Sequence, residues 1–388
     1  MTQGRLRPIL ACVTLLTLGA AGAGCGDDPQ RPPAQGEPRT YYMALSPFPG
    51  EPTPESFDDA LDYVRRNADF ILHQHTEGVP WAELGPDGSG RLPALLQDEI
   101  QRRVEFSRQA GLGVYVATTP LNRLRDGLAP EWGTDAPPPG WEDATFDLPQ
   151  VRDAYVEWCF RLASLYEPDV FAVMVEPNVY EDKRGQANWI PLASLYQEIY
   201  FNVTQIFPDM PVFVTFQLEY LHGELTHDGA SQWDLLGDFN APLDFTAFST
   251  YPSLAHLSAD DLDAAYFLDA AQQARAYAGG PVILAETGYP SEAVTAQGEP
   301  FFATMGDQET YVAKLLDAAD RLSAALVVWR YPFDFGAVLE QSAYPPAVKV
   351  YLEHFVPMGL KEGDGVPKLA DDVWYDNWLR PVAALRRR

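Results

Sequence analysis

Residues 281–290 read PVILAETGYP, an apolar run that ends on the carboxylate of Glu286 and then turns. Residues 170–178, VFAVMVEPN, follow the same pattern and end on Glu176. Continuous apolar runs of this length are typical of parallel strands that are buried on both faces of a sheet. Because the carboxyl ends of parallel strands meet at one edge, the two carboxylates are expected at the same end of the fold.

The same unit, a short apolar run, a loop and an amphipathic segment, recurs along the chain. The predicted strands cover residues 41–49, 68–75, 113–119, 170–178, 211–219, 244–252, 281–290 and 325–333. The predicted helices cover 149–167, 191–207, 258–278, 307–323 and 344–354, after an earlier one that starts at Pro54 behind the N-cap Thr53 and another that stops at Gly111.

Strands that alternate with helices in this way predict an α/β fold, a single (β/α)8 TIM barrel over residues 41–388 with a C-terminal extension. An open, doubly wound parallel sheet is the alternative. Such a sheet normally carries a G-x-G-x-x-G phosphate turn after its first strand, and the residues after 41–49 have no such turn.

The N-terminus predicts export. Arg5 and Arg7 precede an apolar run and a series of small residues, so residues 1–24 are predicted to be a signal peptide. The small residues stop at Cys25, which resembles a bacterial lipoprotein processing site, although Gly22 stands where that pattern usually has Leu. The resemblance implies that Cys25 carries a lipid, and a plain secretory signal is the alternative.

Residues 25–40 are polar and rich in Pro, so they are predicted to be a flexible tether behind the lipidated cysteine. The chain is therefore expected in the bacterial cell envelope, exported and anchored to the outer membrane or cell surface through its N-terminal lipid. We expect a monomer.

The acidic composition limits the class of partner. The formal net charge is −28, and loss of Arg5 and Arg7 would leave 25 basic against 55 acidic residues. A surface of this charge repels nucleic acid and anionic lipid, so no nucleic-acid partner is expected and a neutral or weakly charged substrate is favoured. Cys159 would be the only cysteine left in the barrel, and its apolar helix indicates a core residue rather than a nucleophile.

Glu176 and Glu286 are the candidate catalytic residues. In a barrel of this type the active site lies at the carboxyl ends of the strands, and these two would face each other from the fourth and seventh strands. Two carboxylates across a cleft are what glycoside hydrolysis requires, one as acid and the other as nucleophile or base. The alternative is that each glutamate is structural and accepts hydrogen bonds from a neighbouring strand.

With these residues the chain resembles glycoside hydrolase clan A, and AETGYPSE (285–292) is similar to the nucleophile strand of endo-β-1,4-galactanases and β-1,3-glucanases. The resemblance implies that Glu176 is the acid/base and Glu286 the nucleophile of a retaining enzyme. It also implies that Tyr251, in STYP, hydrogen-bonds the nucleophile. Trp329 would form the floor of the subsite that holds the reacting sugar.

One position departs from the clan pattern. Clan members usually carry Asn immediately before the acid/base, where it binds the sugar 2-hydroxyl, and this chain has Val175 there. Asn178, two residues beyond Glu176, is the candidate replacement. Loss of the Asn leaves a catalytically degenerate, carbohydrate-binding barrel as the alternative function.

Further side chains are predicted to bind substrate. His73 and His75 share one face of their strand, and His75 is expected to hydrogen-bond a sugar or a glutamate, with His73 in the core. A zinc site on this pair is the alternative, but strands five and six carry no histidine, so no metal or cofactor is expected. The remaining candidates are the loop residue Trp81, Gln217, Tyr289, and Glu219, which is also the rival acid.

The long loop at 120–147, with Trp132 and Trp141, is expected to form a cleft wall, as are Asn188 and Trp189 after the fourth strand. The sequence as a whole predicts a glycoside hydrolase that cleaves β-glycosidic bonds of a polysaccharide or oligosaccharide.

Overall fold

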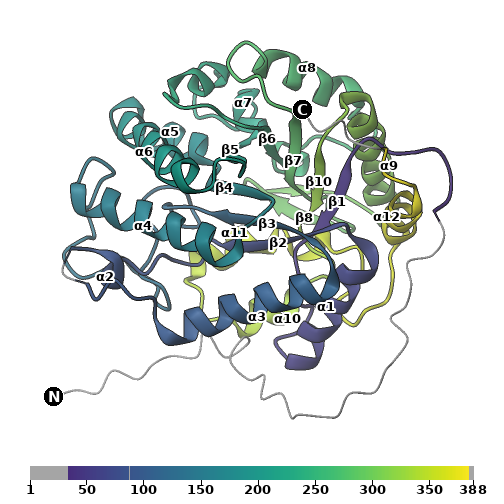
Figure 1. Ribbon diagram of the computed structural model, residues 1–388. Helices are drawn as coiled ribbons and strands as arrows, with labels where there is room; N and C mark the ends of the chain where they lie inside the picture. The colour runs from purple at the N-terminus through teal and green to yellow at the C-terminus, as the bar shows by residue number, and fades with distance from the viewer. Residues whose placement is uncertain (1–33, 87, 384–388) are drawn as a thin grey trace, which may run out of the picture.

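The computed structural model describes residues 34–86 and 88–383. Its centre is a closed barrel of parallel strands in the order β1-β10-β7-β6-β5-β4-β3-β2 (Figure 1). The strands are β1 (Tyr42–Leu45), β2 (Phe70–His75), β3 (Gly113–Thr118), β4 (Val170–Val175), β5 (Val212–Gln217), β6 (Thr246–Thr250), β7 (Val282–Thr287) and β10 (Leu326–Trp329). Each predicted strand is present, and the prediction of a single (β/α)8 barrel is confirmed.

Helices surround the barrel (Figure 1). They are α1 (Pro54–Asn67), α2 (Trp81–Leu84), α3 (Ala94–Ala110), α4 (Pro149–Tyr166), α5 (Pro177–Arg184), α6 (Gln186–Ile206), α7 (Leu218–Leu221), α8 (Ala264–Ala274), α9 (Met305–Leu322), α10 (Gly336–Gln341), α11 (Pro346–Glu353) and α12 (Leu369–Leu379). Capping residues determine where several of these helices begin or end. The Thr53 hydroxyl accepts from Ser56 N before α1, and α3 stops where Gly111 turns left-handed at φ 64°.

Bulges in two strands redirect the side chains at their carboxyl ends. Along β4 the pairing with β5 slips between Ala172 and Met174, so that Val175 returns to the barrel interior. Along β7, Phe248 pairs with Leu284 while Ser249 pairs with Glu286, which leaves Ala285 as the extra residue. A bulge reverses the inward and outward alternation, so Glu286 can point into the barrel mouth although it follows the inward-facing Ala285.

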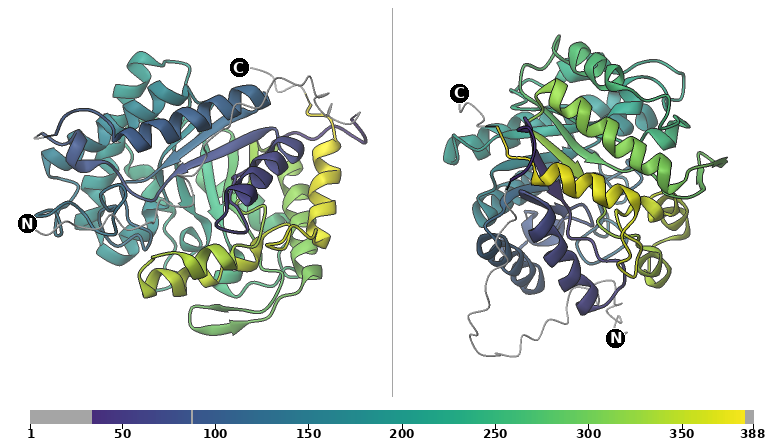
Figure 2. Two further views of the ribbon diagram at one scale, coloured as in Figure 1. Left: turned by 90° about the horizontal axis from the view of Figure 1, so that it is seen from below. Right: turned by 90° about the vertical axis from the view of Figure 1, so that its right-hand side faces the viewer.

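Elements beyond the eight units were not predicted. A small hairpin of β8 (Val294–Ala296) and β9 (Glu299–Phe301) follows β7. The C-terminal α12 lies against α9 and α1 (Figure 2), and the Trp374 indole of α12 donates to the Asn67 carbonyl at 2.9 Å. The predicted extension is therefore a packed part of the domain.

Residues 1–33 lie outside the described residues, and with them the predicted signal peptide, Cys25 and most of the predicted tether. The last tether residues are described. Arg39 is fully buried and pairs with Asp69 at 2.8 Å, so the packed domain begins before residue 41. Among the described residues, no helix combines the length and apolar character needed to cross a membrane.

Candidate active site

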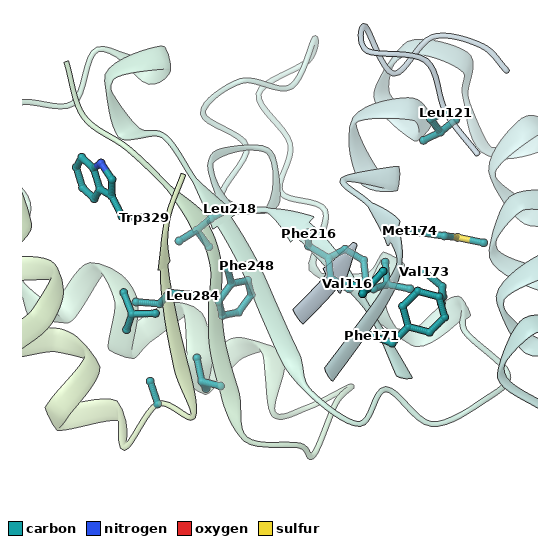
Figure 3. Close-up of a cluster of buried hydrophobic side chains, with 14 of the residues drawn as sticks. Val116, Leu121, Phe171, Val173, Met174, Phe216, Leu218, Phe248, Leu284 and Trp329 are labelled. Atoms are coloured by element: carbon teal, nitrogen blue, oxygen red, sulfur yellow. The ribbon is translucent and has the colours of Figure 1, made fainter. Parts of the chain in front are cut away.

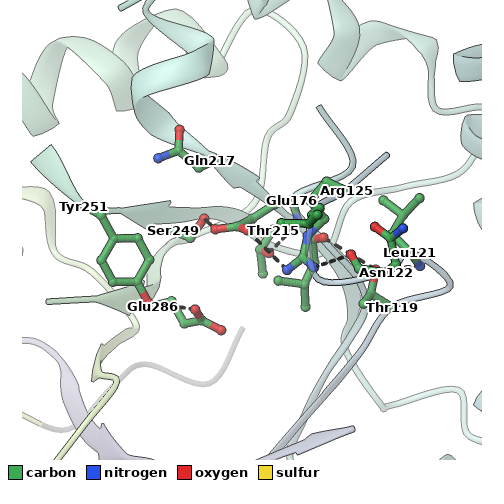
Figure 4. Close-up of polar contacts among 12 residues, drawn as sticks. Thr119, Leu121, Asn122, Arg125, Glu176, Thr215, Gln217, Ser249, Tyr251 and Glu286 are labelled. Atoms are coloured by element: carbon green, nitrogen blue, oxygen red, sulfur yellow. Dashed lines mark hydrogen bonds and ion pairs between the residues drawn. The ribbon is translucent and has the colours of Figure 1, made fainter. Parts of the chain in front are cut away.

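Glu176 and Glu286 line one pocket of about 60 Å³ at the carboxyl ends of the strands. Figure 4 shows both carboxylates, with Ser249 and Arg125 beside Glu176 and Tyr251 beside Glu286. Glu176 follows β4 with φ 55° and ψ 45°, a left-handed conformation that is uncommon for a residue with a side chain. It also precedes Pro177, which normally forces an extended backbone. Its N–H donates to Thr215 O at 2.9 Å, and strained positions held in this way concentrate at functional sites.

Glu176 is a buried carboxyl group with two side-chain partners. Ser249 Oγ donates to its Oε1 at 2.6 Å, and Arg125 Nη2 donates to its Oε2 at 3.2 Å. Burial raises the pKa of Glu176, the Arg125 guanidinium opposes that shift, and the negative charge of Glu286 adds to it. The net direction is upward, which favours the protonated form that a general acid needs.

Glu286 is surrounded by donors. Tyr251 Oη donates to its Oε2 at 2.8 Å, and the Gln74 amide donates to its Oε1. Arg330 Nε lies 3.8 Å from the same Oε2. Burial raises the pKa of Tyr251, so its hydroxyl keeps its proton and remains a donor. Three donors or cations around one carboxylate suit the role of nucleophile.

No protein-family model matches the chain, and no curated protein matches it. Solved structures resemble it in fold. A GH5_18 protein from Streptomyces cattleya, solved with GlcNAc, has a TM-score of 0.62 at 16% identity, over 92% of this chain and 83% of that chain. The Ignisphaera aggregans GH53 catalytic domain has a TM-score of 0.55 at 15% identity, over 89% of this chain and 98% of that one.

An exo-β-1,4-mannosidase from Opitutaceae bacterium strain TAV5 has a TM-score of 0.62 at 14% identity. This chain aligns over 89% of its own length and spans 59% of the mannosidase. These three structures share the closed (β/α)8 barrel fold with this chain. The predicted resemblance to clan A glycoside hydrolases is therefore confirmed in fold. At these sequence identities, an activity for this chain has to be inferred from the geometry of its own pocket.

The two glutamates have partners that the sequence did not predict. Gln74, Arg125, Ser249 and Arg330 all contact one of the two glutamates. Gln74 and Arg330 had a signal in the sequence, since each is a polar residue at the end of an apolar strand. Arg125 had none, because it lies in the long loop after β3, where the backbone path cannot be read from composition.

The two strand histidines face the helices. His73 Nε2 lies 2.8 Å from Ser107 Oγ on α3, and His75 Nε2 lies 3.0 Å from Tyr166 Oη on α4. The prediction that they share a face is confirmed, but the expected substrate contact of His75 is wrong, because alternation along β2 turns Gln74 inward instead. No cluster of three potential metal ligands occurs in residues 34–86 and 88–383.

Trp329 does not reach the pocket. Its indole is fully buried, donates to Met358 O at 2.9 Å and packs on Tyr311 of α9 and Trp374 of α12. Figure 3 shows it among the buried side chains between the barrel and the helices. The expected role as subsite floor is contradicted by this placement. The bulge in β7 shifts its register with β10, and the inward positions beside Trp329 are Val328 and Arg330.

The side chains of Asn178 and Gln217 hydrogen-bond the protein backbone, so the expected contacts to a sugar are contradicted. Asn178 exchanges hydrogen bonds with the main chain of Gln217, at 3.0 Å to its O and 2.9 Å from its N. The Gln217 side chain caps α7 through Tyr220 N and donates to Glu219 Oε2 at 2.5 Å. Asn178 is fully buried, so it does not replace the clan's missing Asn at the sugar.

Glu219 is a buried carboxyl group outside the pocket lining. Thr250 Oγ1 donates to its Oε1 at 2.6 Å, and Tyr251 N donates to its Oε2 at 3.2 Å. Burial raises the pKa of Glu219 to about 7. Because Glu219 accepts from the backbone of Tyr251, it lies behind the residue whose hydroxyl donates to Glu286. This position favours a supporting role for Glu219 over the role of rival acid.

The raised pKa of Glu219 predicts a pH-dependent stability. The folded protein holds this proton up to about pH 7, whereas the unfolded chain releases it near 4.5, so stability falls as pH rises through that window. We expect Glu219→Gln to remove about 3 kcal/mol of this fall, measured by urea unfolding at pH 4.5 and 7.5. Glu299→Gln, an exposed residue on the small hairpin, is the control. An equal fall in wild type and Glu219→Gln would contradict the assignment.

The other aromatic candidates pack inside the protein. Trp81 is fully buried in α2 and donates to Ala129 O at 2.8 Å. Tyr289 is buried, stacks on Tyr311 and bonds the backbone through Ala259 N and Leu257 O. The expected substrate contacts of Trp81 and Tyr289 are therefore contradicted. Neither side chain lines the pocket, and the polar group of each bonds the protein backbone.

The predicted cleft walls are only partly present. Trp132 and Trp141 pack against the core, and Asn188 and Trp189 lie at the start of helix α6 instead of in a loop. The walls of the pocket are formed by other residues, which come from the loop after β3, the end of β10 and the segment around α11: Arg123, Tyr331, Tyr351, Leu352 and Phe355.

Proposed function

We propose that this chain is a retaining glycoside hydrolase, with Glu286 as nucleophile and Glu176 as acid/base. The observation that supports it most is the pairing of two carboxyl groups in one pocket with opposite surroundings. Glu286 is held by the donors Tyr251 and Gln74 and faces a cation, while burial raises the pKa of Glu176. A carboxylate held by donors opposite a buried carboxyl group with a raised pKa is the arrangement expected of a nucleophile and its acid.

The reaction would proceed in two steps. In the first, Glu176 donates its proton to the glycosidic oxygen while Glu286 attacks the anomeric carbon, so the leaving alcohol departs and a glycosyl ester forms on Glu286. In the second, Glu176 takes a proton from water, which displaces Glu286 from the anomeric carbon. Ser249 and Arg125 hold the acid/base before substrate binds, and Tyr251 and Arg330 orient the nucleophile.

For the substrate we propose a β-linked oligosaccharide or polysaccharide. The Opitutaceae protein of the same fold is an exo-β-1,4-mannosidase, and the clan resemblance supports the same anomeric class here. Four of the residues that line the pocket are aromatic, Tyr251, Tyr331, Tyr351 and Phe355, and aromatic faces of this kind support the packing of a sugar ring near the reacting bond.

A second candidate function is sugar binding without hydrolysis. Val175 occupies the position where the clan carries the Asn for the 2-hydroxyl, and its side chain packs in the apolar barrel interior. Contacts to the 2-hydroxyl strengthen in the transition state, so their loss lowers catalysis more than binding. This observation favours a degenerate site.

The two functions differ in turnover. The full chain would be incubated with galactan, β-glucans, xylan and mannan, and with 4-nitrophenyl β-glycosides of neutral and acidic sugars. Released oligosaccharide or nitrophenol, absent in Glu286→Gln, supports the hydrolase. Binding of one glycan by affinity electrophoresis with no product in any variant supports the degenerate barrel.

We also propose that Cys25 carries a lipid that anchors the chain in the bacterial envelope. The support is the basic, apolar and small-residue order of positions 1–25. Growth with a labelled fatty acid should label the full chain and leave Cys25→Ser unlabelled. Equal labelling of both, or none in either, would contradict the anchor.

A further inference from the structure

The pocket is rich in arginine although the chain is acidic. Among its charged lining residues are three arginines, Arg123, Arg125 and Arg330, against the two glutamates. The whole chain has 27 basic and 55 acidic residues, so this concentration of positive charge is local. It contrasts with the neutral or weakly charged substrate that the overall composition favours.

Two of the three arginines have partners other than the acid Glu176. Arg330 faces Glu286 and lies over the Tyr331 ring at 5.2 Å from its centroid. Arg123 pairs with Glu77 and lies over the Tyr344 ring at 4.4 Å. Their charges are therefore balanced before any substrate enters.

Arg125 differs from both. Its Nη1 donates to Asn122 O at 2.9 Å and its Nη2 to Glu176 Oε2 at 3.2 Å, while its buried Nε has no hydrogen-bond partner among the described residues. Its side chain is 12% exposed. Its backbone is left-handed, with φ 55°, so the loop after β3 is held in an uncommon turn that aims this side chain at the pocket (Figure 4).

The chemistry of the acid step then leaves Arg125 without an anion. When Glu176 carries the proton that it donates to the leaving group, the ion pair with Arg125 is lost. A buried cation without a partner is strongly unfavourable. A neutral sugar offers only hydroxyl groups, whereas a carboxylate or sulfate matches the planar fork of a guanidinium with two parallel hydrogen bonds.

We propose that the pocket takes a sugar that carries an anionic group, a uronate carboxylate or a sulfate ester, and that Arg125 is the residue that binds this group. The anion replaces Glu176 as the partner of Arg125. The two donors to the anion are Nη2 of Arg125 and its Nε, which is buried before substrate binds. Substrate binding thereby frees Glu176 to hold its proton. This inference rests on the proposed glycosidase function and names its substrate class.

The test compares matched pairs of 4-nitrophenyl β-glycosides. The pairs are glucuronide with glucoside, galacturonide with galactoside, and 6-sulfo-N-acetylglucosaminide with N-acetylglucosaminide, so that the carboxylate and sulfate sources are separated. For at least one pair we expect wild-type kcat/KM to favour the anionic member by about 100-fold or more. Arg125→Gln should lower kcat/KM on both members, because Arg125 also contacts Glu176, but far more on the anionic one, so that the ratio falls to within about 5-fold.

Two further variants sharpen the result. Arg125→Lys keeps the charge but not the fork, so it should retain part of the preference. Arg321→Gln removes an exposed arginine of α9 that pairs with Asp317, and it should keep the wild-type ratio. Binding of free glucuronate, galacturonate and glucose 6-sulfate would be measured by calorimetry beside glucose and galactose, with wild type and Arg125→Gln.

Each outcome is decisive. Hydrolysis of neutral members as fast as anionic ones overturns the inference and leaves the hydrolase in place. Binding of an anionic sugar that depends on Arg125, without hydrolysis, supports the inference and overturns the hydrolase. If no anionic member is bound or hydrolysed, the inference is overturned, and the hydrolase is then decided by the polysaccharide panel. An Arg125→Gln variant with an unchanged ratio overturns the role of Arg125.

Discussion

Glu286→Gln is expected to lower kcat/KM by about 10⁴-fold or more while the affinity for substrate stays close to that of wild type. The amide has the shape of the carboxylate, so Tyr251 and Gln74 still surround it, but it cannot form a stable ester with the anomeric carbon. Steady-state kinetics on a hydrolysed glycoside measures the loss, and calorimetry with the same glycoside measures the affinity.

Glu292→Gln is the matched control, because it makes the same change at an exposed position a few residues farther along the chain. It should leave both quantities unchanged. Activity of Glu286→Gln within about 10-fold of wild type would remove Glu286 from the nucleophile role.

Glu176→Gln is expected to cost about 10² to 10⁴-fold in kcat/KM on a natural linkage, which is the usual contribution of a positioned general acid. The loss should be much smaller for a 2,4-dinitrophenyl glycoside, because that leaving group departs without a proton. The alkaline limb of the pH profile should also disappear. In wild type, activity falls as pH rises through the raised pKa of Glu176, since the acid is then ionised.

Glu176→Ala supplies a second readout. Azide should enter the space left by the side chain and restore turnover of an activated glycoside, with a β-glycosyl azide as product, because azide needs no general base. Equal losses for good and poor leaving groups, with no azide product, would show that Glu176 only supports the structure.

The fold and the two glutamates were predictable because buried parallel strands and their ends have a strong signature. PVILAETGYP and VFAVMVEPN mark both strands and both carboxylates. The directions in which the neighbouring side chains point were harder to predict from the sequence. Bulges at Ala285 and after Ala172 change the alternation within single strands, and nothing in the apolar runs marks these positions.

The aromatic residues show a second limit. Trp329 resembles a subsite tryptophan in sequence, but α12 covers its face of the barrel with Trp374. The sequence predicts the tail only as an extension, and no local pattern in it indicates that α12 packs against the barrel. Arg125 shows a third limit, because a loop residue with a left-handed backbone is placed by tertiary contacts instead of by any local pattern.

The most direct measurement of the two-glutamate mechanism is the trapping of its intermediate. The full chain would be treated with the 2-deoxy-2-fluoro glycoside of whichever sugar is hydrolysed fastest, then analysed by intact mass and by peptide mapping. We expect one glycosyl group per chain, attached to Glu286, and none on Glu286→Gln. An adduct on Glu219 or another residue, or product of inverted configuration with no adduct, would contradict the retaining mechanism proposed for this pocket.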